Sequence, residues 1–196
     1  YTASSTQLHA RWISNDAESV ITEYQYSIES SSGSTIVSWT STTANEVTVT
    51  GLNLSSSYTY YFNVKAKNAV GLWSPVGSSD GIRYDRPPQI CQFTPNDKSS
   101  FTEKDSIRIY ACAIDYDGDT RTFQVYIDGV IKVPWSVNNG SCLCSIPGAA
   151  FTYDWQTNIG DNGFHTIKVE VSDNKVGPVS KEVTIFIYRK PFGPPL

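Results

Sequence analysis

The stretch that decides the fold is residues 51–75, GLNLSSSYTYYFNVKAKNAVGLWSP. From Tyr60 to Ala66 every second residue is apolar, and Tyr61, Asn63 and Lys65 stand between them. This period of two is typical of a β-strand with one buried face and one hydrated face. Leu54 precedes the strand across a Ser-rich crossover, so Tyr60 is expected at a corner where its ring packs and its hydroxyl bonds nearby backbone.

Shorter alternating segments come before this strand in the first half of the chain. They span residues 8–12, 24–28, 36–39 and 47–49. Turn residues separate the strands: Ser32-Gly33 lies between two of the shorter segments, and the stretch from Asn68 to Gly71 follows the Tyr60 strand. Short strands at regular spacing with such turns predict an antiparallel sandwich. Trp12 is expected to be its central core aromatic residue.

The corner and the strand that follows it resemble the E–F corner and F strand of a fibronectin type III module. The resemblance covers residues 1–85. It implies a β-sandwich that serves as a scaffold of extracellular chains far more often than as an enzyme.

The alternation stops at the linker GIRYDRPPQI, residues 81–90. Proline cannot donate a ladder hydrogen bond and stiffens the chain, so Pro87-Pro88 predicts a domain boundary with a semi-rigid spacer. Alternation restarts beyond it, and Asp128-Gly129 is typical of a tight hairpin turn. The expected second-half strands span residues 107–113, 123–127, 151–155, 167–171 and 183–187.

The segments AIDYDGD, FQVYIDG, GFHTIKVEVSDN and SKEVTIFI resemble the immunoglobulin-like and PKD-type modules of bacterial and archaeal surface proteins. That resemblance covers residues 86–190. The predicted fold class is therefore all-β, with two tandem antiparallel β-sandwiches over residues 1–85 and 86–190, joined by the Pro-stiffened linker.

Residues 191–196 form a Pro-rich tail that looks like the opening A strand of another fibronectin module. The segment before Leu8 lacks such a Pro-marked strand. Two explanations follow: one unit of a covalent tandem array, or a subunit that donates its tail to an open edge of the next subunit. Either contact is head-to-tail and propagates as a fibre. A third explanation is that the termini are chain boundaries or frayed ends. The expected contact residues are Pro191, Pro194, Pro195 and Leu196.

Composition excludes several classes of partner. The formal net charge is −4, and only 17% of residues are charged. A nucleic-acid partner would require a basic stripe, so none is expected. No apolar run approaches the length of a membrane-spanning helix, about 18 residues.

All four cysteines, Cys91, Cys112, Cys142 and Cys144, lie in the second half. An even count in a β-rich chain favours disulfides and an oxidising, extracellular compartment. Zinc is disfavoured, because Cys142-x-Cys144 lacks a second CxxC and a nearby His. Strand parity places Cys91 and Cys112 on one outward face, which favours a Cys91–Cys112 bond, although four cysteines allow three pairings.

Asp115, Asp117 and Asp119 form the sharpest candidate metal site. Carboxylates at alternate positions around a Gly turn begin many calcium loops, so calcium is the one cofactor considered. The bidentate Glu of an EF-type loop is missing, and a plain turn with Asp side chains bonded to their own backbone is the alternative. Asp154, Asp161 and Asp173 lie in or near loops of the same domain and are candidates to complete the site.

The sequence offers little for catalysis, and we expect no enzyme. His9 and His165 are predicted on outward strand positions, without a nucleophile motif. Asp16, Glu18 and Glu23 are the acids from which a glycosidase pair would have to come, but a sandwich edge supplies no cleft for two carboxylates.

Exposed aromatic residues and glycosylation sequons complete the candidates. Trp39 and Trp135 are candidates for stacking on sugars, whereas Trp73 and Trp155 are expected to be structural. Asn53 and Asn139 begin N-x-S sequons, and Asn139 is the better placed of the two. The predicted function is an extracellular structural repeat, one unit of a head-to-tail surface or filament-forming polymer. The alternatives are a glycan-binding or adhesion module and an accessory domain of a secreted enzyme.

Overall fold

A computed structural model describes residues 1–144 and 146–189 of the chain. In those residues strands are joined by turns and loops, so the predicted all-β class is confirmed. Within the same part of the chain no helix is long and apolar enough to cross a membrane. The chain divides into two compact units, Tyr1–Asp85 and Arg86–Leu196.

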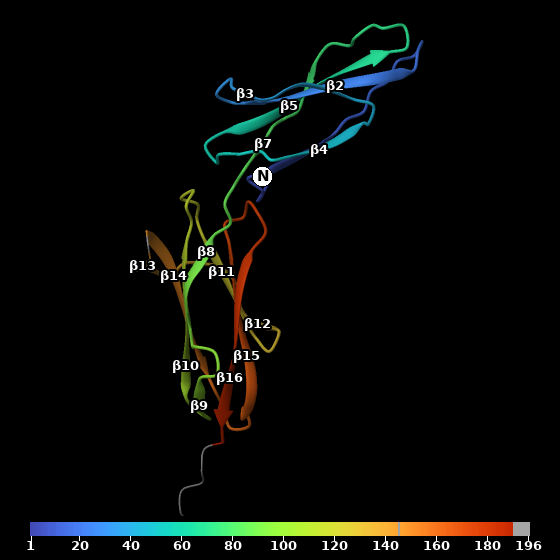
Figure 1. Ribbon diagram of the computed structural model, residues 1–196. Coiled ribbons are helices and arrows are strands. Elements are labelled where there is room, and N and C mark those ends of the chain that lie inside the picture. The colour runs from blue at the N-terminus through green and yellow to red at the C-terminus, as the bar shows by residue number, and fades with distance from the viewer. Residues whose placement is uncertain (145, 190–196) are drawn as a thin grey trace, which may run out of the picture. The chain divides into compact units, whose positions relative to one another are not determined.

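The first unit is built from two sheets (Figure 1). One sheet pairs β1 with β4, and the other has the order β3-β2-β5-β6, with β7 also paired to β5. The strands of this unit are β1 (Gln7–Arg11), β2 (Ile21–Ser30), β3 (Thr35–Thr42), β4 (Glu46–Thr50), β5 (Thr59–Asn68), β6 (Gly77–Ser78) and β7 (Ile82–Arg83). Each of the five segments predicted from alternation coincides with one of the strands β1 to β5.

The first unit has a small core between its sheets. Its buried side chains are Leu8, Tyr26, Ile28, Leu54, Tyr60 and Phe62. Complete burial of one such side chain is worth about 1.5–3 kcal/mol. Trp12 only packs against this cluster and remains partly exposed, so the prediction of Trp12 as the central aromatic was wrong. Trp12 lies just beyond the last residue of β1, at the rim of the sandwich, whereas Tyr60 and Phe62 of β5 are buried.

The second unit also consists of two sheets (Figure 1). Their strand orders are β13-β14-β10-β8 and β12-β11-β15-β16-β9, and β9 runs parallel to β16. The strands of this unit are β8 (Gln89–Thr94), β9 (Ser100–Thr102), β10 (Ser106–Ile114), β11 (Thr122–Ile127), β12 (Val130–Val137), β13 (Gly140–Leu143), β14 (Pro147–Gln156), β15 (Gly163–Ser172) and β16 (Val179–Tyr188).

The core of the second unit follows the predicted alternation. Ile107, Ile109, Ala111 and Ala113 of β10 all face the core, together with alternate residues of β11, β15 and β16. Asp128 and Gly129 join β11 to β12 with positive φ angles of 50° and 75°. Two positive φ angles are typical of a two-residue hairpin turn, and the expected hairpin is confirmed.

Candidate functional sites

The Tyr60 corner has the geometry that its sequence predicts. The Tyr60 side chain is 2% exposed. Its hydroxyl accepts a hydrogen bond from the backbone N–H of Ser55 at 2.7 Å and lies 3.3 Å from the Ser55 carbonyl oxygen, to which it donates. These bonds tie the crossover to the start of β5, so the corner stabilises one end of the first sandwich.

The opposite rim of the same sandwich is open at β1. Among the described residues β1 pairs only with β4, which leaves its other edge without a neighbouring strand. Beside that edge lies a groove of about 370 Å³, lined by Ala10 and Trp12 at the end of β1 and by Gly77 and Ser78 of β6, with Phe62 among its other walls. The indole Nε1 of Trp12 is buried and has no hydrogen-bond partner in the described part of the chain. This rim combines an unpaired strand edge with an apolar groove and an unsatisfied donor.

The exposed tryptophans of the first unit form cation–π contacts with lysines. The Lys65 ammonium lies 4.8 Å from the ring centroid of Trp39 and 4.9 Å from that of Trp73. Lys67 lies 5.5 Å from the Trp73 ring. Cation–π contacts of this kind at exposed sites are worth about 0.5–1 kcal/mol each. Trp73 also forms an isolated β-bridge with Lys67, which agrees with its predicted structural role. Lys65 covers part of the Trp39 ring.

The tryptophans of the second unit differ from each other. Trp155 is 9% exposed and belongs to the core, as predicted. Trp135 lies on β12 with 43% of its surface exposed. Trp39 is also 43% exposed, so the two proposed sugar-stacking residues differ in the Lys65 contact of Trp39 and not in exposed surface.

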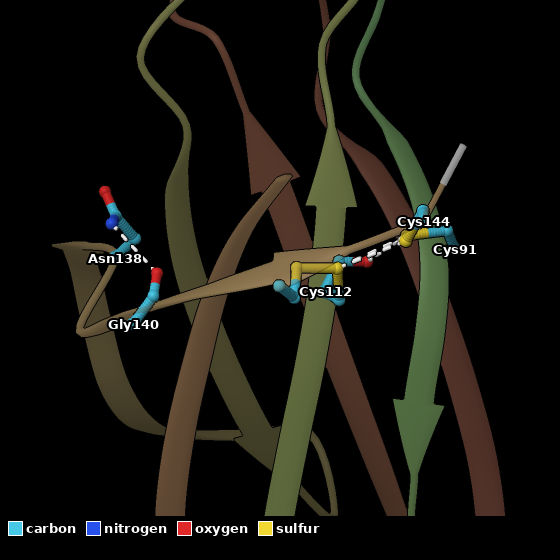
Figure 2. Close-up of a disulfide and its surroundings, with 6 residues drawn as sticks. Cys91, Cys112, Asn138, Gly140 and Cys144 are labelled. Carbon is cyan, nitrogen blue, oxygen red and sulfur yellow. Dashed lines mark hydrogen bonds between the residues drawn. A yellow bond between two sulfur atoms is a disulfide. The ribbon is translucent and has the colours of Figure 1, made fainter. Parts of the chain in front are cut away.

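All four cysteines form disulfides, but the pairing differs from the one that strand parity predicts. Cys91 bonds to Cys144 and Cys112 bonds to Cys142, so the expected Cys91–Cys112 bond was wrong. The parity argument itself holds, because the Cys91 and Cys112 sulfur atoms lie 3.4 Å apart on the same face (Figure 2). It could not foresee that the segment from Cys142 to Cys144 also reaches this face.

A glycine makes this crossing feasible. Cys142 lies opposite Gly148 on the neighbouring strand β14, and β14 stands between β13 and β10. A Cβ atom on Gly148 would lie 3.0 Å from the Cys142 sulfur, 3.2 Å from the Cys112 sulfur and 2.9 Å from the Ala113 carbonyl oxygen. The sequence analysis missed Gly148; the available signal was a glycine inside a strand, which often marks a close approach.

The Asp115 turn is only partly the site that the sequence predicts. Asp115 is 3% exposed, and its Oδ1 accepts the backbone N–H groups of Asp117 and Asp119 at 2.9 and 3.3 Å. Asp119 forms an ion pair with Lys175, with 2.5 Å between Oδ2 and Nζ. Asp117 Oδ2 accepts the Arg86 backbone N–H at 2.8 Å. In residues 1–144 and 146–189 no three carboxylates converge within 4.8 Å, so a three-Asp cage is not assembled.

Of the three further acids, only Asp173 is tied to this end of the sandwich. The Lys175–Asp119 ion pair joins the loop after β15 to the Asp115 turn. Asp173 is 5% exposed, and its Oδ1 accepts the N–H groups of Lys175 and Val176. Asp154 instead pairs with Arg108 near the start of β10, and the Asp161 carboxylate accepts the Asn158 N–H.

Two buried carboxylate oxygens remain unsatisfied at this end. Oδ2 of Asp115 and Oδ2 of Asp173 are both inaccessible and have no hydrogen-bond partner among the described residues. Buried polar atoms without a partner are costly and uncommon. In the described part of the second unit, Arg121 Nε is also buried without a hydrogen-bond partner.

The acids proposed for a glycosidase pair serve the local structure. A hydrogen bond from the Glu18 backbone and another from Asn68 lower the pKa of Asp16. The Ser41 hydroxyl, followed by Lys67, lowers the pKa of Glu23. A general acid requires a raised pKa instead.

The two histidines occupy different environments. His9 is exposed, as expected, whereas His165 is only 16% exposed, so its predicted outward position was wrong. One ring nitrogen of His165 lies 2.7 Å from Asp128 Oδ2, and the other lies 2.8 Å from the Asp161 carbonyl oxygen. Burial opposes the charged ring, but the bonds to Asp128 and Asp161 prevail and raise the pKa of His165. The imidazolium form donates both hydrogen bonds.

The two sequons also differ. Asn139 donates from Nδ2 to the Thr152 carbonyl oxygen and accepts the Thr152 N–H, both at 2.9 Å. The first of these bonds engages Nδ2, the nitrogen that a glycan would modify, whereas Asn53 is exposed in the crossover before Tyr60. The expected contact residues Pro191, Pro194, Pro195 and Leu196 lie outside the described residues.

Known proteins resemble this chain at the level of a family model and of solved structures. Residues 88–169 match the family model described as Bacterial Ig domain. The chain is similar to the fibronectin(III)-like modules of Clostridium thermocellum CbhA, at 18% identity over 94% of this chain and 87% of that one, with a TM-score of 0.51. A match to the titin domains z1z2 in complex with telethonin has 13% identity over 94% of this chain and 88% of that one, and a TM-score of 0.35.

No curated protein matches the chain. The CbhA similarity supports the fold, and the family model supports the assignment of the second unit. With its two disulfides, the match to a bacterial Ig domain is consistent with an extracellular protein. The chain is a tandem of fibronectin III-like and bacterial Ig-like β-sandwiches.

Proposed function

We propose that this chain is an extracellular structural module that assembles head-to-tail, without catalytic activity of its own. The open rim of the first sandwich carries the proposal. An unpaired strand edge presents a row of backbone donors and acceptors that favours pairing with another strand. In this chain the edge belongs to β1, and the apolar groove beside it is about 370 Å³.

The proposed occupant is the segment KPFGPPL, residues 190–196, of a neighbouring copy. An extended segment rises about 3.3 Å per residue, so it is long enough to cover the 5 residues of β1. Main-chain bonds to β1 would supply affinity, and Phe192 or Leu196 would supply the side chain that fills the groove. Because the donor and the acceptor are different surfaces, the contact propagates in one direction.

The test uses a chain truncated after Tyr188 and a synthetic RKPFGPPL peptide. We expect one peptide to bind per chain in calorimetry, and the full chain to form fibres or concentration-dependent oligomers in light scattering and electron microscopy. Gly77→Leu should abolish both, because a Cβ at Gly77 meets only the Val64 carbonyl oxygen at 3.9 Å and a larger side chain would project into the groove. Gly177→Leu is the matched control, at a glycine with open space around it.

The outcomes separate the alternatives. Peptide binding with fibre formation supports strand donation between subunits. Peptide binding without oligomers of the full chain favours a covalent array, in which the same segment acts within one polypeptide. A monomeric full chain that does not bind the peptide refutes the proposal. Glycan binding that is lost in Trp135→Ala would support the adhesion alternative instead.

We also propose a calcium site. Its ligands would be Asp115 and Asp173, in place of the predicted set Asp115, Asp117 and Asp119. The two unsatisfied, buried Oδ2 atoms favour it, because calcium prefers carboxylate and carbonyl oxygens and would compensate their charge. Millimolar calcium should raise the melting temperature of the second unit, and Asp115→Asn or Asp173→Asn should remove the effect. Asp119→Asn should preserve it, since Asp119 is committed to Lys175. An unchanged melting temperature and no heat of binding would exclude the site.

A further inference from the structure

The two disulfides of the second unit lie against each other: three of the four sulfur atoms form one close group, and the fourth, of Cys142, is bonded to one of them. Cys112 Sγ is bonded to Cys142 and lies 3.4 Å from Cys91 Sγ and 3.2 Å from Cys144 Sγ. The Sγ atoms of Cys91, Cys112 and Cys144 all lie within 4.8 Å of one another. In the part of the chain that the structure describes, no other group of three His, Cys, Asp or Glu side chains is this close.

The fold builds this cluster from three parts of one sheet. Cys91 comes from β8, Cys112 from β10, and Cys142 and Cys144 from the end of β13 and the turn after it. Figure 2 shows Cys91, Cys112 and Cys144 converging on the same face of β8 and β10. Cys112 is 0% exposed and the other three are partly buried. The missing side chain of Gly148 leaves the room in which two of the sulfurs meet.

Four converging cysteine sulfurs are also a donor set for a soft divalent metal. Structural zinc sites bind four thiolates in a tetrahedron at about 2.3 Å, which places the sulfurs about 3.8 Å apart. The contacts between the two disulfides, 3.4 and 3.2 Å, are already close to that spacing. On reduction the two bonded pairs would separate, and Cys142 Sγ, which lies outside the group of three within 4.8 Å, would have to move toward the others. The Cα–Cα distances across the two bonds are 6.4 and 6.1 Å.

We propose that the reduced chain binds one Zn²⁺ through Cys91, Cys112, Cys142 and Cys144. A dithiol reductant supplies two electrons and two protons to each disulfide, is itself oxidised to a disulfide, and leaves four thiols. Zn²⁺ then displaces the four thiol protons and forms four Zn–S bonds, which gives a complex of net charge −2. The metal and the disulfides are mutually exclusive cross-links between the same strands.

This arrangement gives the second unit a cross-link in either redox state. A chain that is folded in a reducing compartment would be held by zinc, and oxidation would replace the metal with two disulfides. The sequence argument against zinc rested on the lack of a second CxxC or a His near Cys142-x-Cys144. The fold supplies the missing ligands from Cys91 and Cys112, which are far away in the sequence.

The experiment compares the oxidised and reduced forms of the full chain. The protein is reduced anaerobically with a phosphine, four free thiols are verified, and Zn²⁺ is titrated in competition with a chromophoric chelator. Co²⁺ is titrated as a spectroscopic probe. We expect one metal per reduced chain, the absorption of tetrahedral thiolate-bound Co²⁺, and a rise in the melting temperature of the second unit with Zn²⁺. The oxidised chain should bind none.

Variants distinguish a built site from loose thiols. Cys112→Ser, which removes the central sulfur, should weaken Zn²⁺ binding at least tenfold and abolish the tetrahedral Co²⁺ spectrum. Gly148→Ala keeps all four thiols and should also weaken binding, because its Cβ occupies the space between two of them. Absence of metal binding by the fully reduced chain overturns the proposal. Equal affinity in Cys112→Ser also overturns it, because scattered thiols would then account for the binding.

Discussion

The Tyr60 corner allows a prediction whose size follows from the structure. Tyr60→Phe removes one hydroxyl and keeps the ring, which is 2% exposed. The hydroxyl accepts the Ser55 N–H at 2.7 Å and donates to the Ser55 carbonyl oxygen at 3.3 Å. Ser55 itself is exposed, so water can partly replace the lost partner. A net loss of about 1–2 kcal/mol is therefore expected, within the range for hydrogen bonds whose partner is not fully buried.

A loss of that size is measurable in this unit. For a domain of this length, about 1 kcal/mol shifts the melting temperature by roughly 4–8 °C. Because the chain has two units, hydrogen–deuterium exchange of β5 peptides should accompany calorimetry, so that the change is assigned to the first unit. We expect faster exchange in β5 and in the crossover before it, with unchanged exchange in β10 and β15.

Tyr58→Phe is the matched control, because Tyr58 lies in the same crossover with 41% of its surface exposed. It should change the melting temperature by less than a third of the Tyr60→Phe effect. Equal effects of the two substitutions would refute the argument, since they would show that the corner hydroxyl contributes nothing beyond any phenol on this surface.

Three further predictions concern stability. Because the pKa of His165 is raised in the folded state, its hydrogen bonds contribute fully to stability below about pH 6.5, and this contribution is lost as pH rises through the folded-state pKa. His165→Asn should therefore cost more stability at pH 5.5 than at pH 9. An equal cost at the two pH values in thermal melts would contradict this. Gly148→Ala should destabilise the oxidised second unit by about 1–3 kcal/mol, because its Cβ would lie 2.9 Å from a backbone oxygen; a melting temperature like that of the wild type would disprove the crowding. Gly81→Ala should lower the stability measured in urea titrations more than Gly33→Ala does. Both glycines have positive φ, but only a Cβ at Gly81 would meet other side chains, at 2.6 and 2.7 Å. Similar losses of stability in the two variants would argue against this crowding.

The sequence predicts most of the fold because alternation is a local property. A strand with one buried face must place apolar residues at every second position, and this holds for β5 and β10 whatever their neighbours are. The same local rule correctly places Cys91 and Cys112 on one outer face. The Tyr60 corner is also readable, because its hydrogen-bond partner Ser55 is only five residues away.

The candidate sites depend on segments that are distant in sequence. Trp12 belongs to an alternating segment, but its burial depends on whether a strand covers the outer edge of β1. Asp119 belongs to an Asp-rich turn, but its carboxylate forms an ion pair with Lys175 from the loop after β15. Neither outcome is encoded in the pattern around the residue itself.

The sequence by itself determined that this chain forms two β-sandwiches, because the side-chain period and the turn residues act within each strand and its hairpin. Only the tertiary structure decided how the cysteines combine. Their pairing requires the segment from Cys142 to Cys144 to cross β14 at Gly148 and meet β10 and β8. That crossing depends on the packing of strands brought together from across the second unit, and no local pattern specifies it.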